Sequence, residues 1–100
     1  MELLAVTGAL GAEVRGIDLR KPLRDTDAEK LYQGLTQHQV LFFRKQSLTP
    51  QSHLALADAF GEIDPGHPVY PHVEGFQSLV ELIADADNPP DTGDWHKDLT

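Results

Sequence analysis

The last seven residues, Asp94-Trp95-His96-Lys97-Asp98-Leu99-Thr100, place a histidine and an aspartate two positions apart. In a β-strand, side chains at positions i and i+2 leave the same face about 7 Å apart. If this stretch is a strand, the His96 imidazole and the Asp98 carboxylate can approach one ion, while Lys97 points to the opposite face. The sequence therefore predicts two ligands of a metal site.

An imidazole and a carboxylate are two of the three protein ligands in the facial triad of non-heme Fe(II) oxygenases. That triad leaves three adjacent positions on the metal for a co-substrate and O2. The spacing alone is weak evidence, because a His-x-Asp triplet arises easily by chance in a chain with five histidines. The competing interpretation is a surface histidine beside a solvated carboxylate.

Composition narrows the possible functions. The chain of 100 residues contains no cysteine, which excludes disulfides, thiolate ligands and a thiol nucleophile. Its net charge of −8 repels phosphate backbones and anionic lipids, so we expect neither nucleic-acid nor membrane binding. The amino terminus lacks the basic and apolar regions of a signal peptide, and no apolar run has the length of a membrane span. We therefore expect a cytoplasmic protein.

Four segments read as β-strands. The β-prone segments Glu2–Val6 and Ala12–Ile17 are separated by a turn that contains glycines, which predicts a hairpin or a meander. The short apolar run Val40–Phe43 is typical of a buried strand. The fourth predicted strand is Leu79–Ala84.

The first of two helices is predicted over Asp27–His38. Thr26 and Glu29 have the spacing of a capping box, and His38 at the end suits the helix dipole. Four apolar residues at helical spacing are expected to face the core: Ala28, Leu31, Tyr32 and Leu35.

The second helix is predicted to begin with Thr49 as its cap and Pro50 at its first position, and to end before Gly61. His53 is expected to face solvent. The inner face of this helix is predicted to consist of Leu54, Ala57 and Phe60.

Two irregular segments complete the chain. Prolines keep residues Glu62–Gly75 from forming a regular helix, and this segment contains His67-Pro68-Val69-Tyr70-Pro71-His72. The acidic segment Asp85–Gly93 lacks the ligand spacing of an EF-hand, so a solvated loop is expected rather than a calcium site.

Four motifs in this order resemble the amino-terminal part of the taurine dioxygenase (TauD/TfdA) family of Fe(II)- and 2-oxoglutarate-dependent dioxygenases. The resemblance extends from Gly11 to Thr100, nearly the whole chain. The motifs are His38-Gln39-Val40-Leu41-Phe42-Phe43-Arg44, His67-Pro68-Val69-Tyr70-Pro71-His72, Asn88-Pro89-Pro90-Asp91 and Trp95-His96-Lys97-Asp98-Leu99-Thr100.

The resemblance implies a mixed α+β fold: part of a double-stranded β-helix, or jelly roll, with two flanking amino-terminal helices. Residues 1–100 are then the amino-terminal portion of one dioxygenase domain, and the jelly roll is incomplete in this chain. The resemblance assigns His96 and Asp98 to the metal, with a later histidine as third ligand. It places that histidine and the arginine that binds 2-oxoglutarate beyond Thr100, so we expect this chain alone to be inactive.

The resemblance also implies a substrate site. His67 is expected to contact the sulfonate end of the substrate, Tyr70 to contact the substrate as well, and the backbone N–H of Leu99 to help hold the sulfonate. Thr92 stands where the family has an asparagine. Because threonine has no amide group, this position does not determine which substrate the protein binds. By contrast, Trp95 and His72 are expected to pack or support structure.

The implied reaction hydroxylates taurine or a similar small sulfonate with O2, releasing sulfite and an aldehyde together with succinate and CO2. Thr92 also permits an alkyl sulfate ester or an aryloxyalkanoate as substrate. We expect a homo-oligomer for the full-length parent. Two other interpretations remain: a non-catalytic chain that needs a partner polypeptide, because about four strands are predicted where a jelly roll has eight, and a zinc hydrolase, which lacks a recognisable third ligand.

Overall fold

The chain begins with the predicted hairpin. Strand β1 (Glu2–Ala5) runs antiparallel to β2 (Ala12–Arg15). In the turn, Gly11 has φ of 91°, which glycine adopts without steric cost, and its carbonyl accepts a hydrogen bond from the Val6 N–H at 3.0 Å.

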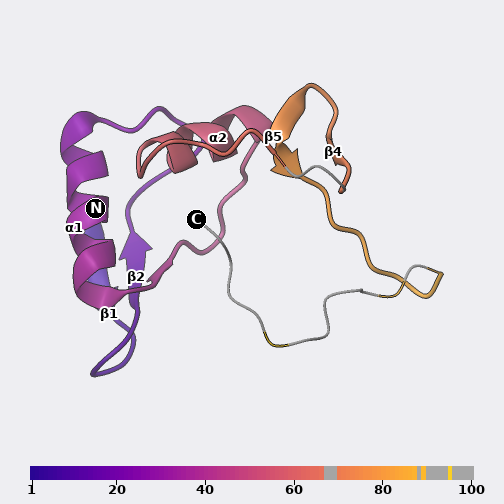
Figure 1. The fold of residues 1–100 in the computed structure, drawn as a ribbon. Helices are drawn as coiled ribbons and strands as arrows, with labels where there is room; N and C mark the ends of the chain where they lie inside the picture. Colours follow the sequence, from indigo (N-terminus) through magenta and orange to yellow (C-terminus); the bar gives the residue numbers. More distant parts are fainter. Residues whose placement is uncertain (67–69, 88, 90–94, 96–100) are drawn as a thin grey trace. The chain divides into compact units, whose positions relative to one another are not determined.

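The computed structural model describes residues 1–66, 70–87, 89 and 95 (Figure 1). It divides the chain into two units, Met1–Glu62 and Ile63–Thr100. Within the described residues, no helix is both long enough and apolar enough to cross a membrane. The mixture of helices and strands agrees with the predicted α+β class.

In the first unit, helix α1 (Asp25–His38) connects β2 to β3 (Leu41–Phe42), and β3 lies parallel to β2. Adjacent parallel strands require a crossover of this kind. The strand order is β1-β2-β3, so β2 is the central strand of the sheet. Figure 1 shows α1 running beside this sheet.

The core of this unit lies between α1 and one face of the sheet. Strand pairing places Leu3 opposite Val14 and Leu41 opposite Ala12, and all four share one face. On the helix, Gly34 is buried, and a Cβ there would collide with the Leu3 side chain and lie 3.8 Å from Leu41 Cδ2. The buried apolar side chains of the described residues are Ala12, Val14, Leu19 and Leu31.

The opposite face of the sheet carries charged side chains and is partly exposed to solvent. Glu13 pairs with Arg15 at 3.1 Å and with Arg44 at 3.5 Å, and the Arg44 guanidinium lies 5.8 Å from the centroid of the Phe42 ring. Phe42 is 40% exposed and Val40 is 38% exposed. The strand predicted within Val40–Phe43 is therefore confirmed at Leu41–Phe42, but the prediction that it is buried was wrong, because successive side chains of β3 point to opposite faces of the sheet.

Helix α1 begins differently from the prediction. Arg24, not Thr26, occupies the N-cap position, and no side chain caps the first turn. The predicted capping box is therefore absent, and the Arg24 guanidinium instead pairs with Asp27 at 3.1 Å. Leu31 and Gly34 define the buried face, which leaves Tyr32 56% exposed. The Tyr32 ring stacks on Phe60 with centroids 6.5 Å apart.

Helix α2 (Pro50–Asp58) begins as predicted, with Thr49 as its cap. The Thr49 hydroxyl accepts from the Ser52 N–H at 3.1 Å, and the Ser52 hydroxyl accepts from the Thr49 N–H at 2.8 Å. Two of the otherwise unpaired donors are thereby satisfied. His53 is exposed, as expected, but so is Ala57, which was predicted to face the core.

The second unit contains a hairpin that the proline-rich sequence concealed. Strand β4 (His72–Val73) pairs antiparallel with β5 (Phe76–Val80), and Gly75 in the turn has φ of 81°. The predicted strand Leu79–Ala84 was therefore placed about three residues too late. Residues 81–85 form no regular structure and are exposed.

Candidate functional site

Most of the predicted site lies outside the described residues. This applies to both metal ligands and to three of the substrate residues: His96, Asp98, His67, Thr92 and Leu99. Their roles therefore stay predictions from the sequence. Within the described part of the chain, no three His, Cys, Asp or Glu side chains gather closely enough to hold a metal ion.

Tyr70 is the one predicted substrate residue that the structure describes. It is half-buried and immediately precedes Pro71, whose carbonyl accepts a hydrogen bond from the Glu81 N–H at 2.8 Å. The Pro71–Glu81 hydrogen bond lies at the open end of the β4-β5 hairpin. Tyr70 therefore lies next to a backbone position that the hairpin fixes.

His72 contributes to the hairpin, in agreement with the structural role expected for it. It lies in β4, is exposed, and its Nδ1 is 2.9 Å from the carbonyl oxygen of Val73. This ring nitrogen is therefore engaged by the local backbone.

Trp95 does not pack as expected. Its side chain is 103% exposed, although an indole buries a large apolar area when it finds a partner. No described residue covers this ring, and the expectation that it walls the site or anchors a strand stays a prediction, because the neighbouring site residues lie outside the described part of the chain.

Only the beginning of the acidic segment lies within the described residues, and it agrees with a solvated loop. Asp85 and Asp87 are exposed, and the Asp87 N–H donates to the Asp85 carboxylate at 2.9 Å. This is a local turn contact.

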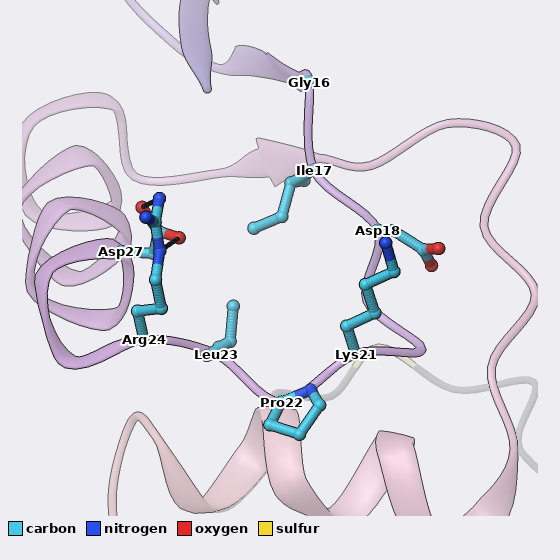
Figure 2. Close-up of a pocket in the computed structure, with 8 residues that line it drawn as sticks. All are labelled: Gly16, Ile17, Asp18, Lys21, Pro22, Leu23, Arg24 and Asp27. Carbon is cyan, nitrogen blue, oxygen red and sulfur yellow. Dashed lines mark hydrogen bonds and ion pairs between the residues drawn. The ribbon is translucent and has the colours of Figure 1, made fainter.

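The first unit contains an open cavity of about 590 Å³ that the sequence did not suggest. Figure 2 shows Ile17 and Leu23 pointing into it from opposite sides, with the Arg24–Asp27 ion pair on one wall. The lining residues are Gly16, Ile17, Asp18, Lys21, Pro22, Leu23, Arg24 and Asp27.

The carboxylates of this cavity are already neutralised. Asp18 accepts from the Arg20 guanidinium at 3.1 and 3.0 Å and from the Arg20 N–H at 3.0 Å. These bonds lower the pKa of Asp18 to about 2 and raise the pKa of Arg20. A carboxylate with so low a pKa is a poor proton acceptor at neutral pH, so Asp18 is a poor candidate for a general base.

A smaller cavity of about 300 Å³ lies on the other side of Ile17 and Asp18, next to Lys45, Gln46 and Ser47. The Gln46 amide is fully engaged: its Nε2 donates to Ile17 O at 3.1 Å and its Oε1 accepts from Leu19 N–H at 3.0 Å. Gln46 therefore fixes the loop between the two cavities.

Comparison with known proteins identifies the family. The chain is 35% identical over 101 residues to an alpha-ketoglutarate-dependent sulfate ester dioxygenase of Pseudomonas putida, covering 100% of this chain and 33% of that protein. It is 33% identical over 101 residues to an alkylsulfatase of Acinetobacter baylyi, covering 100% of this chain and 31% of that one. The chain thus spans about one third of the length of these curated relatives.

A solved structure agrees with these relatives. The crystal structure of a taurine dioxygenase from Burkholderia xenovorans has a TM-score of 0.71 and 36% identity, covering 76% of this chain and 27% of that one. A sequence model of the family described as taurine catabolism dioxygenase TauD, TfdA matches residues 2–100. The chain therefore belongs to the TauD, TfdA family of taurine catabolism dioxygenases.

Proposed function

We propose that this chain is the amino-terminal portion of an Fe(II)- and 2-oxoglutarate-dependent dioxygenase, within a single jelly-roll domain. The family match over residues 2–100 carries the proposal, since it extends through the His96-x-Asp98 pair. The sulfate ester dioxygenase of P. putida is alpha-ketoglutarate-dependent by its description. We further propose that the full-length protein is a homo-oligomer.

The proposed metal ligands are His96 and Asp98. An imidazole and a carboxylate fit Fe(II), and the chain has no cysteine that would favour a softer metal. When bound, iron and 2-oxoglutarate would supply oxidising power from O2, with succinate and CO2 as products. The two side chains would hold the metal and leave adjacent positions open. A later histidine and an arginine, implied by the family resemblance, would complete the site.

The proposed substrate is a small anion with a sulfonate or sulfate group. Tyr70 and His67 would donate hydrogen bonds to its oxygens, the Leu99 N–H would donate another, and Thr92 would line the same end. Such donors recognise a tetrahedral anion through charge-assisted hydrogen bonds. Binding there would present the carbon next to the sulfur-containing group to the metal.

Hydroxylation of that carbon explains the products. On a sulfonate, the hydroxylated carbon would lose sulfite as its C–S bond breaks and its hydroxyl becomes an aldehyde. On a sulfate ester, the C–O bond would break and sulfate would leave. In both reactions one oxygen atom of O2 enters the substrate and the other enters succinate.

A sulfate ester is the second candidate substrate. Thr92 replaces the family asparagine, and both curated relatives are named for sulfate esters or alkyl sulfates. The solved taurine dioxygenase at 36% identity supports the sulfonate. Product analysis separates them, because taurine would yield sulfite and hexyl sulfate would yield sulfate. A Thr92→Asn variant should move the ratio of kcat/KM values toward taurine if this residue selects the substrate.

Anaerobic titration with Fe(II) and 2-oxoglutarate tests the metal site. We expect a weak visible charge-transfer band in the full-length protein, and its loss in His96→Ala and Asp98→Ala. His53→Ala, which changes an exposed histidine of α2, is the matched control and should keep the band. No band in the full-length protein would contradict the dioxygenase proposal, and a band in residues 1–100 alone would show that the third ligand lies within this chain.

A further inference from the structure

Gly66 lies where its backbone is pressed against strand β5. Its φ is 123°, a conformation that side chains with a Cβ rarely adopt. A Cβ at this position would collide with the carbonyl oxygen of Gln77 and lie 3.2 Å from its carbonyl carbon. Because the obstacle is backbone, no change of rotamer can relieve it.

The chain meets the same hairpin again five residues later, just beyond the end of β5. The Pro71 carbonyl accepts a hydrogen bond from the N–H of Glu81, the residue that follows β5, at 2.8 Å. The chain thus meets this hairpin at two contact points: Gly66 lies against Gln77 within β5, and Pro71 is hydrogen-bonded to Glu81 just after β5. Tyr70 lies directly before the second contact point and is half-buried.

From these two contact points we infer that Gly66 is a positioning residue for substrate binding. Without a Cβ, Gly66 can lie against Gln77 at the start of the segment that leads to Tyr70, and this close approach sets where the Tyr70 side chain meets the anionic substrate. This inference rests on the proposed function, which assigns Tyr70 to the substrate. Gly66 itself touches no reacting atom.

The other glycines near this unit provide matched controls. Gly75 has a positive φ of 81°, but a Cβ there would meet no atom within 4 Å. Gly61 has neither a positive φ nor a neighbour within 4 Å of an added Cβ. Gly75→Ala thus tests backbone strain alone, and Gly61→Ala tests the change of composition alone.

The test compares Gly66→Ala, Gly75→Ala and Gly61→Ala in the full-length protein, under anaerobic conditions with Fe(II). Two quantities are measured for each: the Kd of 2-oxoglutarate from the charge-transfer band, and the Kd of taurine and of hexyl sulfate by calorimetry. For Gly66→Ala we expect a rise in the Kd of the preferred sulfur-containing anion of about tenfold or more, because misplacement by about 1 Å at a binding group is costly. Its Kd for 2-oxoglutarate should change by less than about twofold.

The outcomes separate the two proposals. If Gly66→Ala weakens anion binding no more than Gly75→Ala does, strain rather than close approach governs this site, and the positioning role is wrong. An equal loss of 2-oxoglutarate binding would also overturn it, since the effect would then be general. If the wild-type protein binds 2-oxoglutarate but neither anion, the substrate proposal fails before any variant is compared.

Discussion

Gln46 shows how one side chain can connect distant parts of the sequence. Its amide reaches the backbone of Ile17 and Leu19, 29 and 27 residues away. We expect Gln46→Ala to lower the free energy of unfolding by about 1–3 kcal/mol, because partly buried backbone groups lose their partners. Gln46→Glu should also destabilise the fold, since a carboxylate cannot donate to Ile17 O.

Urea unfolding of these two variants measures the effect. Gln33→Ala, on an exposed position of α1, is the control and should stay within about 0.5 kcal/mol of wild type. Equal stabilities for Gln46→Ala and Gln33→Ala would show that the Gln46 bonds contribute nothing.

Two residues other than glycine adopt the left-handed conformation, Gln39 with φ of 71° and Lys45 with φ of 55°. This conformation costs a residue with a Cβ about 1 kcal/mol or more. We therefore expect Gln39→Gly, just after α1, and Lys45→Gly each to stabilise the protein by up to about 1 kcal/mol. Gln37→Gly within α1 is the control and should destabilise by a similar amount. The denaturant midpoints of the variants measure these changes in stability. A loss of stability in Gln39→Gly would contradict the left-handed conformation of Gln39.

Asp18 makes the stability depend on pH in acid. Its pKa falls from an ordinary value of 3.8 to about 2 because Arg20 donates hydrogen bonds to the carboxylate. The lowered pKa contributes stability that is complete above the unfolded value and is lost as pH falls from about 4 to about 2. The stability difference between wild type and Asp18→Asn should therefore shrink over this range. Glu29→Gln changes an exposed carboxylate and serves as the control. If the stability difference between wild type and Asp18→Asn did not depend on pH, the result would contradict the ion pair between Asp18 and Arg20.

At the scale of elements, the contact between α1 and the sheet depends on the missing side chain at Gly34. Alanine there would gain about 1 kcal/mol of helix propensity, but its Cβ would collide with the Leu3 side chain. We expect Gly34→Ala to be destabilising in wild type and neutral or stabilising in the Leu3→Ala background. A double-mutant cycle by urea unfolding measures this coupling. Additive effects would show that Leu3 moves aside freely.

The sequence predicted those elements whose signals are local. Thr49 and Pro50 start α2 because cap and first turn are adjacent in the chain. Thr26 and Glu29 matched a capping box equally well, yet the helix begins at Asp25. The extended backbone of Arg24, with ψ of 152°, makes Arg24 the N-cap residue, so the helix starts at the next residue. The spacing of residue types in the sequence does not reveal this backbone conformation. The β4-β5 hairpin was missed because its two-residue strand β4 is too short to show alternation.

For the candidate site, the sequence predicted the types of the functional residues but not their arrangement in space. The residue types and spacing of His96 and Asp98 predict a metal site, but both residues lie outside the described part of the chain. The close approach of Gly66 to Gln77, by contrast, joins residues eleven positions apart through the backbone. A sequence pattern records side-chain types and therefore gave no signal for it. The two cavities of the first unit arise from loop geometry and were missed for the same reason.

At the scale of the whole molecule, large apolar side chains remain in contact with water. Leu82 is 67% exposed, Ile83 is 66% exposed and Trp95 is 103% exposed. Exposed apolar surface of this kind promotes association. We expect the isolated chain to bind a hydrophobic dye and to unfold over a broad temperature range, and Leu82→Ser/Ile83→Ser to bind less dye. A sharp, cooperative melt of the monomeric chain would contradict this.

The parallel pairing of β2 with β3 has a consequence for synthesis on the ribosome. Ala12 lies opposite Leu41, so β1 and β2 can form their hairpin early, but the sheet gains its third strand only after α1 has been translated. The contacts that form later in the chain, from Gln46 to Leu19 and from Phe60 to Tyr32, still fall within Met1–Glu62. Domains generally fold as units, amino-terminal first, while translation continues. Every contact of the first unit is therefore available to the nascent chain before the codons for His96 and Asp98 are read.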